Sequence, residues 1–128
     1  MGDIVKISKD SIKLLHDEQV ELYGGSLGFL DEGLFEYLCE KPFQVVYGME
    51  LYPDIYEKAV EFLYGFAQYQ VFADGNKRTG TVTCIVFLEL NGIELELDSK
   101  EFEQIVLKIA NNELDKKEVI EYLKDHTI

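Results

Sequence analysis

Apolar residues recur at helical spacing through most of this chain, which favours a mainly helical protein. Residues 9–22 carry apolar positions three and four residues apart, and the pair Gly24-Gly25 that follows them is a typical helix terminator. Residues 32–40 show the same pattern, with Asp31 in front of them as an N-cap and a proline just beyond them. The first third of the chain is therefore predicted to hold two helices joined by a loop.

The middle of the chain is predicted to form two long helices on either side of a tight loop. The first begins within residues 52–54 and ends near Gln68, and the second covers residues 76–90, where Asn91-Gly92 ends it. The core-facing side chains are expected to be Ile55, Ala59, Phe62, Leu63 and Phe66 in the first helix and Val82, Ile85, Val86, Leu88 and Leu90 in the second.

The last third of the chain combines one alternating stretch with two helical ones. Residues 93–97 alternate between apolar and acidic side chains, so a short extended connector is expected there. A helix is predicted over residues 100–110, and another ends at Leu123. Asp115 and Glu118 have the spacing of a capping box at the start of that last helix.

The chain has 128 residues, which is a common size for one domain. We therefore expect a single all-α domain over residues 1–128, with five to six helices and one short extended segment. Acidic residues outnumber basic ones by 25 to 12, which gives a formal net charge of −13. Nucleic acid and anionic membranes are not expected as partners, because both attract basic surfaces. Solubility is the simplest explanation of the charge, and a basic protein partner is the alternative.

The chain shows no sign of export. Its first residues contain no apolar signal segment, and no apolar run approaches the ~20 residues that a membrane span needs. Cys39 and Cys84 fit no metal or redox spacing and lie among apolar residues, which is typical of buried free thiols in a reducing compartment. A cytoplasmic location is therefore expected.

The segment with the clearest chemistry lies between the two central helices. A glycine turn followed by a helix start presents unpaired backbone N–H groups and the positive end of the helix dipole, which suits a phosphate. Lys77 and Arg78 add two cations at a helix end where cations are otherwise unfavourable, so they indicate a bound anion. Asp74 is placed to hold Mg²⁺ on a polyphosphate, and Asn76 is able to hydrogen-bond backbone or phosphate. Gly75 allows the backbone to approach the ligand closely.

An ordinary turn at the start of a helix is the alternative interpretation of this segment. Asp74, Gly75 and Asn76 are common turn residues, and Lys77 and Arg78 are compatible with a solvated surface. From the residues alone, the phosphate site is therefore a weak hypothesis.

The segment Phe72-x-Asp74-Gly75-Asn76-Lys77-Arg78-Thr79 resembles the signature of the Fic/Doc superfamily, H-x-F-x-[DN]-[AG]-N-[KG]-R. The resemblance continues through Leu15-His16-Asp17, Tyr23-Gly24-Gly25 and Asp31-Glu32-Gly33-Leu34 on one side, and through Phe87-Leu88-x-x-Asn91-Gly92 on the other. It covers about residues 11–125, which is nearly the whole chain. Lys77 stands where other Fic proteins carry glycine, and this indicates the Doc branch.

The resemblance implies an α-helical Fic fold and a nucleotide-dependent transferase. Fic proteins typically transfer AMP from ATP, whereas Doc-type toxins phosphorylate a threonine of elongation factor Tu and are blocked by a cognate antitoxin. The resemblance implies that Asp74 binds Mg²⁺ and that Phe72 anchors the loop in the core. It also implies that residues 43–48 form a flap over a target peptide, with a plain connector as the alternative. The residues implied to hold the ATP phosphates are Gly75, Asn76, Lys77, Arg78 and Thr79.

The departure from the family signature is at its first position. The family has a histidine two residues before Phe72, which acts as the general base, and this chain has Gln70 there. A carboxamide orients a hydroxyl but does not accept its proton near pH 7, and losing a general base costs about 10²–10⁴ in rate. The two histidines of the chain, His16 and His126, have no claim from their sequence positions to replace that base.

Three interpretations of Gln70 stay open at this point. It is a change made to disarm a toxin, a native change in a protein that keeps only nucleotide or partner binding, or a native change compatible with slow or altered transfer. The favoured hypothesis is a Doc-type toxin that uses ATP and Mg²⁺ on a protein hydroxyl, with impaired catalysis. A non-catalytic binding protein and a protein adenylyltransferase are the alternatives.

Overall fold

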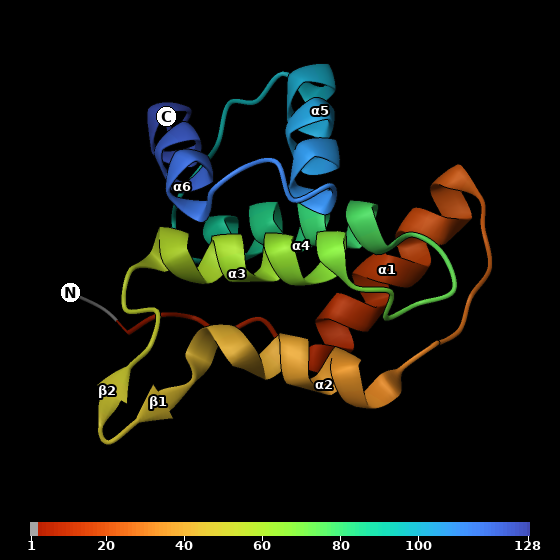
Figure 1. Cartoon of the computed structure of the whole chain (residues 1–128), viewed down its shortest axis with the longest axis horizontal. Helices are drawn as coiled ribbons and strands as arrows, with labels where there is room; N and C mark the ends of the chain where they lie inside the picture. The colour runs from red at the N-terminus through yellow and green to blue at the C-terminus, as the bar shows by residue number, and fades with distance from the viewer. Residues whose placement is uncertain (1–2) are drawn as a thin grey trace.

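The computed structural model describes residues 3–128 (Figure 1). Its helices confirm the prediction of a mainly helical chain and agree closely with the predicted boundaries. They are α1 (Lys9–Tyr23), α2 (Glu32–Glu40), α3 (Ile55–Gln68), α4 (Asn76–Leu90), α5 (Ser99–Ala110) and α6 (Lys116–Asp125). A short 3-10 helix, η1 (Lys41–Phe43), and two short strands, β1 (Val45–Val46) and β2 (Met49–Glu50), lie between α2 and α3.

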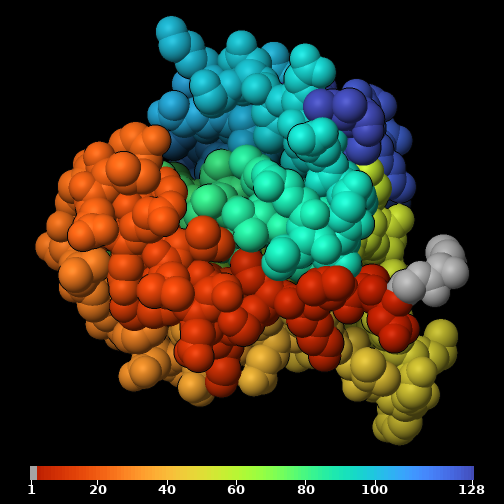
Figure 2. Space-filling view, turned by 180° about the vertical axis from the view of Figure 1, so that it is seen from behind, coloured from red at the N-terminus to blue at the C-terminus, as the bar shows by residue number. Residues whose placement is uncertain are grey.

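The centre of the molecule is α3, which is buried on every side over residues 58–67. Helix α4 packs along it, α5 and α6 lie on one side of this pair, and α1 and α2 lie on the other (Figure 1). From behind, the segment before α1 and α1 itself cover the flank of α4 (Figure 2). The predicted core face of α3 is confirmed, since Ala59, Phe62, Leu63 and Phe66 are fully buried and Ile55 packs against the core.

The core face of α4 differs in part from the predicted one. Leu88 is buried as expected, and Ile85 and Val86 are half-buried and pack against the core. Val82 is half-buried outside that core cluster, and Leu90 is exposed. The face that packs on the core is made of Thr79, Gly80, Thr83, Cys84, Phe87 and Leu88. A Cβ on Gly80 would lie only 3.2 Å from the carbonyl oxygen of Leu63 and from Cβ of Phe66. Close approach of α4 to α3 at this point thus requires a residue without a side chain, and the fully buried face of α4 combines small residues with Phe87 and Leu88.

Five of the six helices in residues 3–128 begin with a capping side chain. The carboxylate or hydroxyl oxygen of the N-cap residue accepts a backbone N–H of the first turn in each of them. The N-cap residues are Ser8, Asp31, Asp54, Asp98 and Asp115. Helix α4 starts instead at Gly75, which has a left-handed backbone and no side chain to accept a hydrogen bond.

The reciprocal capping box lies at a different helix from the predicted one. Asp54 and Glu57 form it at the start of α3. The Asp54 side chain accepts the backbone N–H of Glu57, and the Glu57 side chain accepts the backbone N–H of Asp54. Asp115 does cap α6, but its carboxylate accepts the N–H of Lys117 rather than that of Glu118.

The segment over residues 43–48, predicted to be a loop, contains a hairpin. Val45 pairs with Glu50 and Val46 with Met49, and the turn residues Tyr47 and Gly48 both have positive φ. The hairpin precedes α3, whereas the loop before α4 follows the other end of α3 (Figure 1). Fourteen helical residues span about 20 Å, so α3 separates the hairpin from that loop by about this distance. A flap over a target peptide stays a prediction.

The extended stretch over residues 93–97 is confirmed and finds a partner at the C-terminal end. Leu95 forms an isolated antiparallel bridge with Thr127. The N–H of Glu96 donates to the carbonyl of His126 at 2.8 Å, and the N–H of Ile128 donates to that of Glu94 at 2.9 Å. The end of α6 is thereby tied to the connector before α5.

Both cysteines are buried free thiols, as predicted. Burial raises the pKa of the Cys39 and Cys84 thiols to about 12, so neither is a thiolate near neutral pH. In the described part of the chain, none of the helices is both long enough and apolar enough to span a bilayer.

Candidate functional site

The loop between α3 and α4, residues 69–75, is fixed to the core through Phe72. This ring is fully buried, as expected of an anchor, and stacks against His16 with 3.5 Å between ring centroids. Phe29 and Phe35 pack around the same ring at 5.1 and 5.4 Å. The loop is therefore held by an aromatic cluster drawn from α1, α2 and the segment between them.

His16 supports the loop from beneath. It is fully buried, and its Nε2 donates to the carbonyl oxygen of Asp74 at 2.7 Å, while Nδ1 lies 2.9 Å from Oδ1 of Asp17. Burial alone would raise the pKa of Asp17, but hydrogen bonds from Lys13 and His16 outweigh it and lower that pKa. Both ring nitrogens of His16 are thus engaged inside the protein, and His16 does not replace the missing general base.

Asn76 uses its side chain to shape the loop. Its Oδ1 accepts the N–H groups of Val71 at 3.1 Å and Phe72 at 2.9 Å, and its Nδ2 donates to the carbonyl of Phe72 at 3.0 Å. The sequence left open whether this side chain bonds to backbone or to phosphate, and in the structure it bonds to the backbone. The main-chain N–H of Asn76 remains the group that it offers to a ligand.

Thr79 also directs its side chain into the protein. The residue is fully buried, and its hydroxyl donates to the carbonyl of Gly75 at 2.8 Å. The backbone N–H of Thr79 donates to the same carbonyl at 3.0 Å, which is the first hydrogen bond inside α4. The Thr79 hydroxyl is therefore not exposed to a phosphate in this arrangement.

The start of α4 exposes unsatisfied hydrogen-bond donors. The backbone N–H groups of Asn76, Lys77 and Arg78 precede that first bond, and no acceptor for them is present among residues 3–128. The side chains of Lys77 and Arg78 are exposed and form no salt bridge with an acidic side chain of the described chain. This helix end combines N–H donors, a dipole and two cations, which is the arrangement that binds anions.

Two further side chains border this helix end. The guanidinium carbon of Arg78 lies 4.7 Å from the centroid of the Tyr23 ring. Asp74 is exposed, and its Oδ2 accepts the N–H of Ser26 at 2.8 Å. The structure thus brings Asp74, Gly75, Lys77 and Arg78 together at one exposed place.

A second chain segment, residues 26–31, runs alongside the loop. Leu30 and Asp31 donate their N–H groups to the carbonyl of Val71 at 2.8 and 3.1 Å, and Ala73 donates to the carbonyl of Gly28 at 3.1 Å. Phe29 and Phe72 form an antiparallel bridge. This pairing could not be predicted from local sequence patterns, because the two paired segments lie more than forty residues apart. The high glycine content of residues 24–28 was the one available signal.

Gln70 stands at the start of the loop with an exposed side chain. Its neighbour Tyr69 is 51% exposed, so the position is open to a large acceptor. An amide side chain donates and accepts hydrogen bonds but does not take up a proton near neutral pH. The position therefore supports orientation of a hydroxyl and not its deprotonation.

Asp74 is an exposed carboxylate beside the start of α4, and carboxylate oxygen is a ligand type that Mg²⁺ binds. No group of three His, Cys, Asp or Glu side chains within residues 3–128 is arranged to hold a metal ion. Mg²⁺ commonly binds through one or two carboxylates together with substrate phosphates and water. Oδ2 of Asp74 accepts the N–H of Ser26, whereas Oδ1 has no hydrogen bond within residues 3–128.

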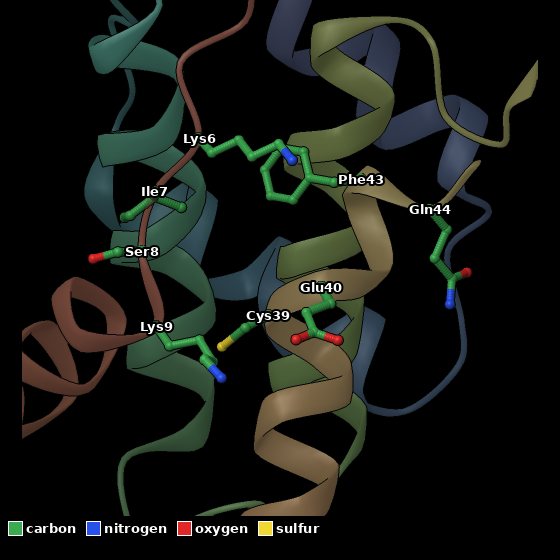
Figure 3. Close-up of a pocket in the computed structure, with 8 residues that line it drawn as sticks. All are labelled: Lys6, Ile7, Ser8, Lys9, Cys39, Glu40, Phe43 and Gln44. Carbon is green, nitrogen blue, oxygen red and sulfur yellow. The ribbon is translucent and has the colours of Figure 1, made fainter. Parts of the chain in front are cut away.

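Two cavities in the described part of the chain lie away from this loop. One of ≈ 390 Å³ opens between the segment before α1 and the end of α2, with the Lys6 ammonium over the Phe43 ring (Figure 3). Its lining residues are Lys6, Ile7, Ser8, Lys9, Cys39, Glu40, Phe43 and Gln44. None of the predicted site residues lines this cavity.

Comparison with known proteins gives a family match. The profile of the Fic/DOC family matches residues 6–88. The chain is 33% identical over 95 residues to "Toxin Doc" of Mycolicibacterium smegmatis, a match that covers 73% of each chain. It is 30% identical over 118 residues to "Protein kinase doc" of Escherichia phage P1, covering 92% of each chain.

Proposed function

The chain belongs to the Fic/DOC family, and we propose that it is a Doc-type toxin that transfers a phosphoryl group from ATP to a protein hydroxyl. The observation that carries this proposal is the uncapped start of α4, where Lys77 and Arg78 lie beside unsatisfied N–H groups. The names of the two relatives, a toxin and a protein kinase, support the choice of phosphoryl transfer. Lys77 in place of the glycine of other Fic proteins supports the same choice.

Different groups around the start of α4 bind different parts of ATP and its metal ion in this proposal. The N–H groups of residues 76–78 and the helix dipole bind phosphate oxygens, and Lys77 and Arg78 neutralise their charge. Asp74 holds Mg²⁺ together with the phosphates. The ion, when bound, supplies charge neutralisation on the phosphates during transfer.

Gln70 sets the rate of the proposed transfer. At this position an amide orients the acceptor hydroxyl but leaves its proton in place. General-base catalysis typically contributes about 10²–10⁴ in rate, so the transfer is slower by that order than with histidine. Binding of ATP does not need a base and is retained.

The acceptor and the inhibitor are both proteins in this proposal. Exposed apolar side chains lie in the loop, at Tyr69, and in the neighbouring segment, at Leu27 and Leu30, which suits a protein acceptor. The family's known target, elongation factor Tu, is the proposed acceptor, and the proposed location is therefore the cytoplasm. A cognate antitoxin is the proposed partner, because the resemblance to Doc-type toxins implies one and a relative of this chain is named as a toxin.

Gln70 also favours one other candidate function. A protein that keeps the nucleotide site but has lost the base would act as a non-catalytic binding protein. AMP transfer is the remaining alternative, and the position of the transferred label distinguishes it from phosphoryl transfer.

The test compares the chain with its Gln70→His variant. Each is incubated with Mg²⁺ and with α- or γ-labelled ATP, first with purified elongation factor Tu and then with a cell extract. Label from γ-labelled ATP on a protein, stronger with Gln70→His, supports the proposal, and label from α-labelled ATP supports AMP transfer. The double variant Gln70→His with Asp74→Ala is the control and is expected to lose transfer. Binding of ATP without label from either protein would overturn the enzymatic proposal in favour of a binding protein.

A further inference from the structure

We infer that Gly25 and Ser26, in the glycine segment over residues 24–28, are positioning residues that orient the Asp74 carboxylate toward Mg²⁺. This inference rests on the proposed function, because it concerns the metal that accompanies ATP at the start of α4. The segment connects α1 to the chain that runs beside the loop, and three of its residues, Gly24, Gly25 and Gly28, have positive φ.

The first support is the contact between the segment and the carboxylate itself. The N–H of Ser26 donates to Oδ2 of Asp74 at 2.8 Å, although the two residues lie 48 positions apart. This bond fixes the plane of an exposed carboxylate and leaves Oδ1 unbonded. An exposed aspartate without such a bond would rotate freely between rotamers.

The second support is the space between Gly25 and Asp74. A Cβ on Gly25 would lie 2.9 Å from Cβ of Asp74, 3.3 Å from its Cγ and 3.4 Å from its Oδ2. The first of these distances is too short for two carbon atoms, so a side chain at Gly25 would push Asp74 away. The Gly25 backbone therefore forms a wall against which the Asp74 side chain rests.

The main chain on both sides of this contact is fixed as well. His16 Nε2 donates to the carbonyl of Asp74 at 2.7 Å, and the N–H of Ala73 donates to the carbonyl of Gly28 at 3.1 Å. Neither the loop nor the glycine segment is thus free to shift away from the other. Asp74 is preorganised from α1 below and from the glycine segment at its side.

This arrangement matters for Mg²⁺ more than for phosphate. Mg²⁺ demands near-ideal octahedral geometry, so a displaced carboxylate binds it poorly. The phosphates are held instead by the N–H groups of residues 76–78 and by Lys77 and Arg78, none of which contacts the glycine segment between residues 24 and 28 through a hydrogen bond. Disturbing Gly25 should therefore weaken the contribution of Mg²⁺ to ATP binding and spare the rest.

Gly28 provides a matched control for Gly25. The two residues have nearly the same positive φ, +119° at Gly25 and +117° at Gly28, a value that is unfavourable for alanine at either position. A Cβ on Gly28 would meet nothing within 4 Å. Gly25→Ala and Gly28→Ala thus differ in the contact with Asp74.

The experiment measures the affinity of the full chain for ATP by calorimetry, with Mg²⁺ and again with EDTA. The unchanged chain is expected to bind ATP more tightly with Mg²⁺ than with EDTA. Gly25→Ala should lose about 10- to 100-fold in the Mg²⁺ condition, the usual effect of removing support from a metal ligand, and keep its affinity in EDTA. Gly28→Ala should keep the Mg²⁺ enhancement. Equal Mg²⁺ enhancement in the two variants would overturn the inference.

A double-mutant cycle and a measurement on the unchanged chain complete the test. In an Asp74→Asn background, Gly25→Ala should cause no further loss, whereas additive losses would show that Gly25 acts elsewhere and would overturn the inference.

In the unchanged chain, the Ser26 amide resonance should shift with ATP and Mg²⁺ and stay in place with ATP and EDTA. This readout does not depend on how well the variants fold. If the unchanged chain binds no ATP in either condition, the proposed function fails and the inference fails with it, whereas ATP binding with an unmoved Ser26 amide overturns the inference alone.

Discussion

The imidazole of His16 lies almost parallel to the ring of Phe72, with 10° between the ring planes and 3.5 Å between the centroids. Through this contact, α1 supports the loop that carries the candidate site. The same imidazole also bonds to the carbonyl of Asp74, so one buried side chain fixes two points of the loop.

We predict that His16→Ala destabilises the protein by about 3 kcal/mol, the usual cost of truncating a large buried ring. The substitution leaves a cavity against Phe72 and removes the donor to the Asp74 carbonyl. Urea unfolding followed by circular dichroism measures the change. Leu14→Ala on the same helix, at a position 69% exposed, is the control and should change stability by less than about 0.5 kcal/mol. A similar effect in the two variants would contradict the role assigned to His16.

Asn76→Ala is expected to loosen the loop. The variant leaves the N–H groups of Val71 and Phe72 without their acceptor, at a cost of about 1–3 kcal/mol for a buried group. Asn76→Asp keeps an acceptor oxygen and loses the donor to the Phe72 carbonyl, so it should destabilise less. Thermal unfolding ranks the variants, and hydrogen exchange should show faster exchange at Val71 and Phe72 in Asn76→Ala. Unchanged exchange at these amides would refute the assignment.

Gly80→Ala should separate α3 from α4. The added methyl would lie 3.2 Å from the carbonyl oxygen of Leu63 and from Cβ of Phe66, and such overpacking typically costs about 1–3 kcal/mol. Gly33→Ala in α2 is the matched control, because its Cβ would meet only an oxygen of Asp31, at 3.6 Å. Replacing a helical glycine by alanine raises the free energy of unfolding by about 0.5–1 kcal/mol where the new methyl group meets no clash. The two variants should therefore change the free energy of unfolding in opposite directions, and a gain in both would be inconsistent with close packing at Gly80.

The misassigned face of α4 shows where the hydrophobic pattern fails as a guide. The helix boundaries followed from local signals, Gly75 at one end and Asn91-Gly92 at the other, and they agree with the structure. The buried face did not follow, because the distance between α3 and α4 selects small residues such as Gly80 over larger apolar ones. Hydrophobicity describes how favourably a side chain leaves water, whereas the contact between α3 and α4 at Gly80 depends on how much space a side chain occupies.

The hairpin was missed for a different reason. Its turn requires positive φ at both central positions, and the usual residues there are Asn and Gly. This chain places Tyr47 at the first of them, with φ of 51°, where a non-glycine residue is uncommon. The sequence signal of the turn is therefore hidden. Strands of two residues also give too few positions for an alternating pattern.

The candidate site was predictable in part. The residues from Asp74 to Arg78 could be placed at a helix start, and the structure gathers their exposed groups there. The pairing of residues 26–31 with the loop was not predictable, because it depends on how α1 and α2 pack around Phe72. The backbone bonds of the Asn76 side chain were one of the two predicted alternatives, whereas the bond from the Thr79 hydroxyl to the Gly75 carbonyl was not predicted.

Stability should fall at alkaline pH. Burial raises the pKa of the Cys39 and Cys84 thiols from 9.0 to about 12, and burial with nearby carboxylates raises that of the Tyr64 phenol from 10.0 to about 12. The unfolded chain releases these protons first, so their stabilising contribution is complete below about pH 9 and declines as pH rises toward 12. Urea unfolding between pH 8 and pH 11 should show this decline. Tyr64→Phe should reduce it, whereas Tyr47→Phe, at a fully exposed position, should not. A flat profile would be the contrary result.

The central claim is that the uncapped start of α4 binds the phosphates of ATP, and amide resonances report on it directly. The N–H groups of Asn76, Lys77 and Arg78 have no acceptor among residues 3–128, and a phosphate oxygen would supply one. A titration of the ¹⁵N-labelled chain with ATP and Mg²⁺ should therefore shift these amide resonances more than those at the capped starts of the other helices. Saturable binding of ATP that leaves these amides in place, or no binding at all, would contradict the claim.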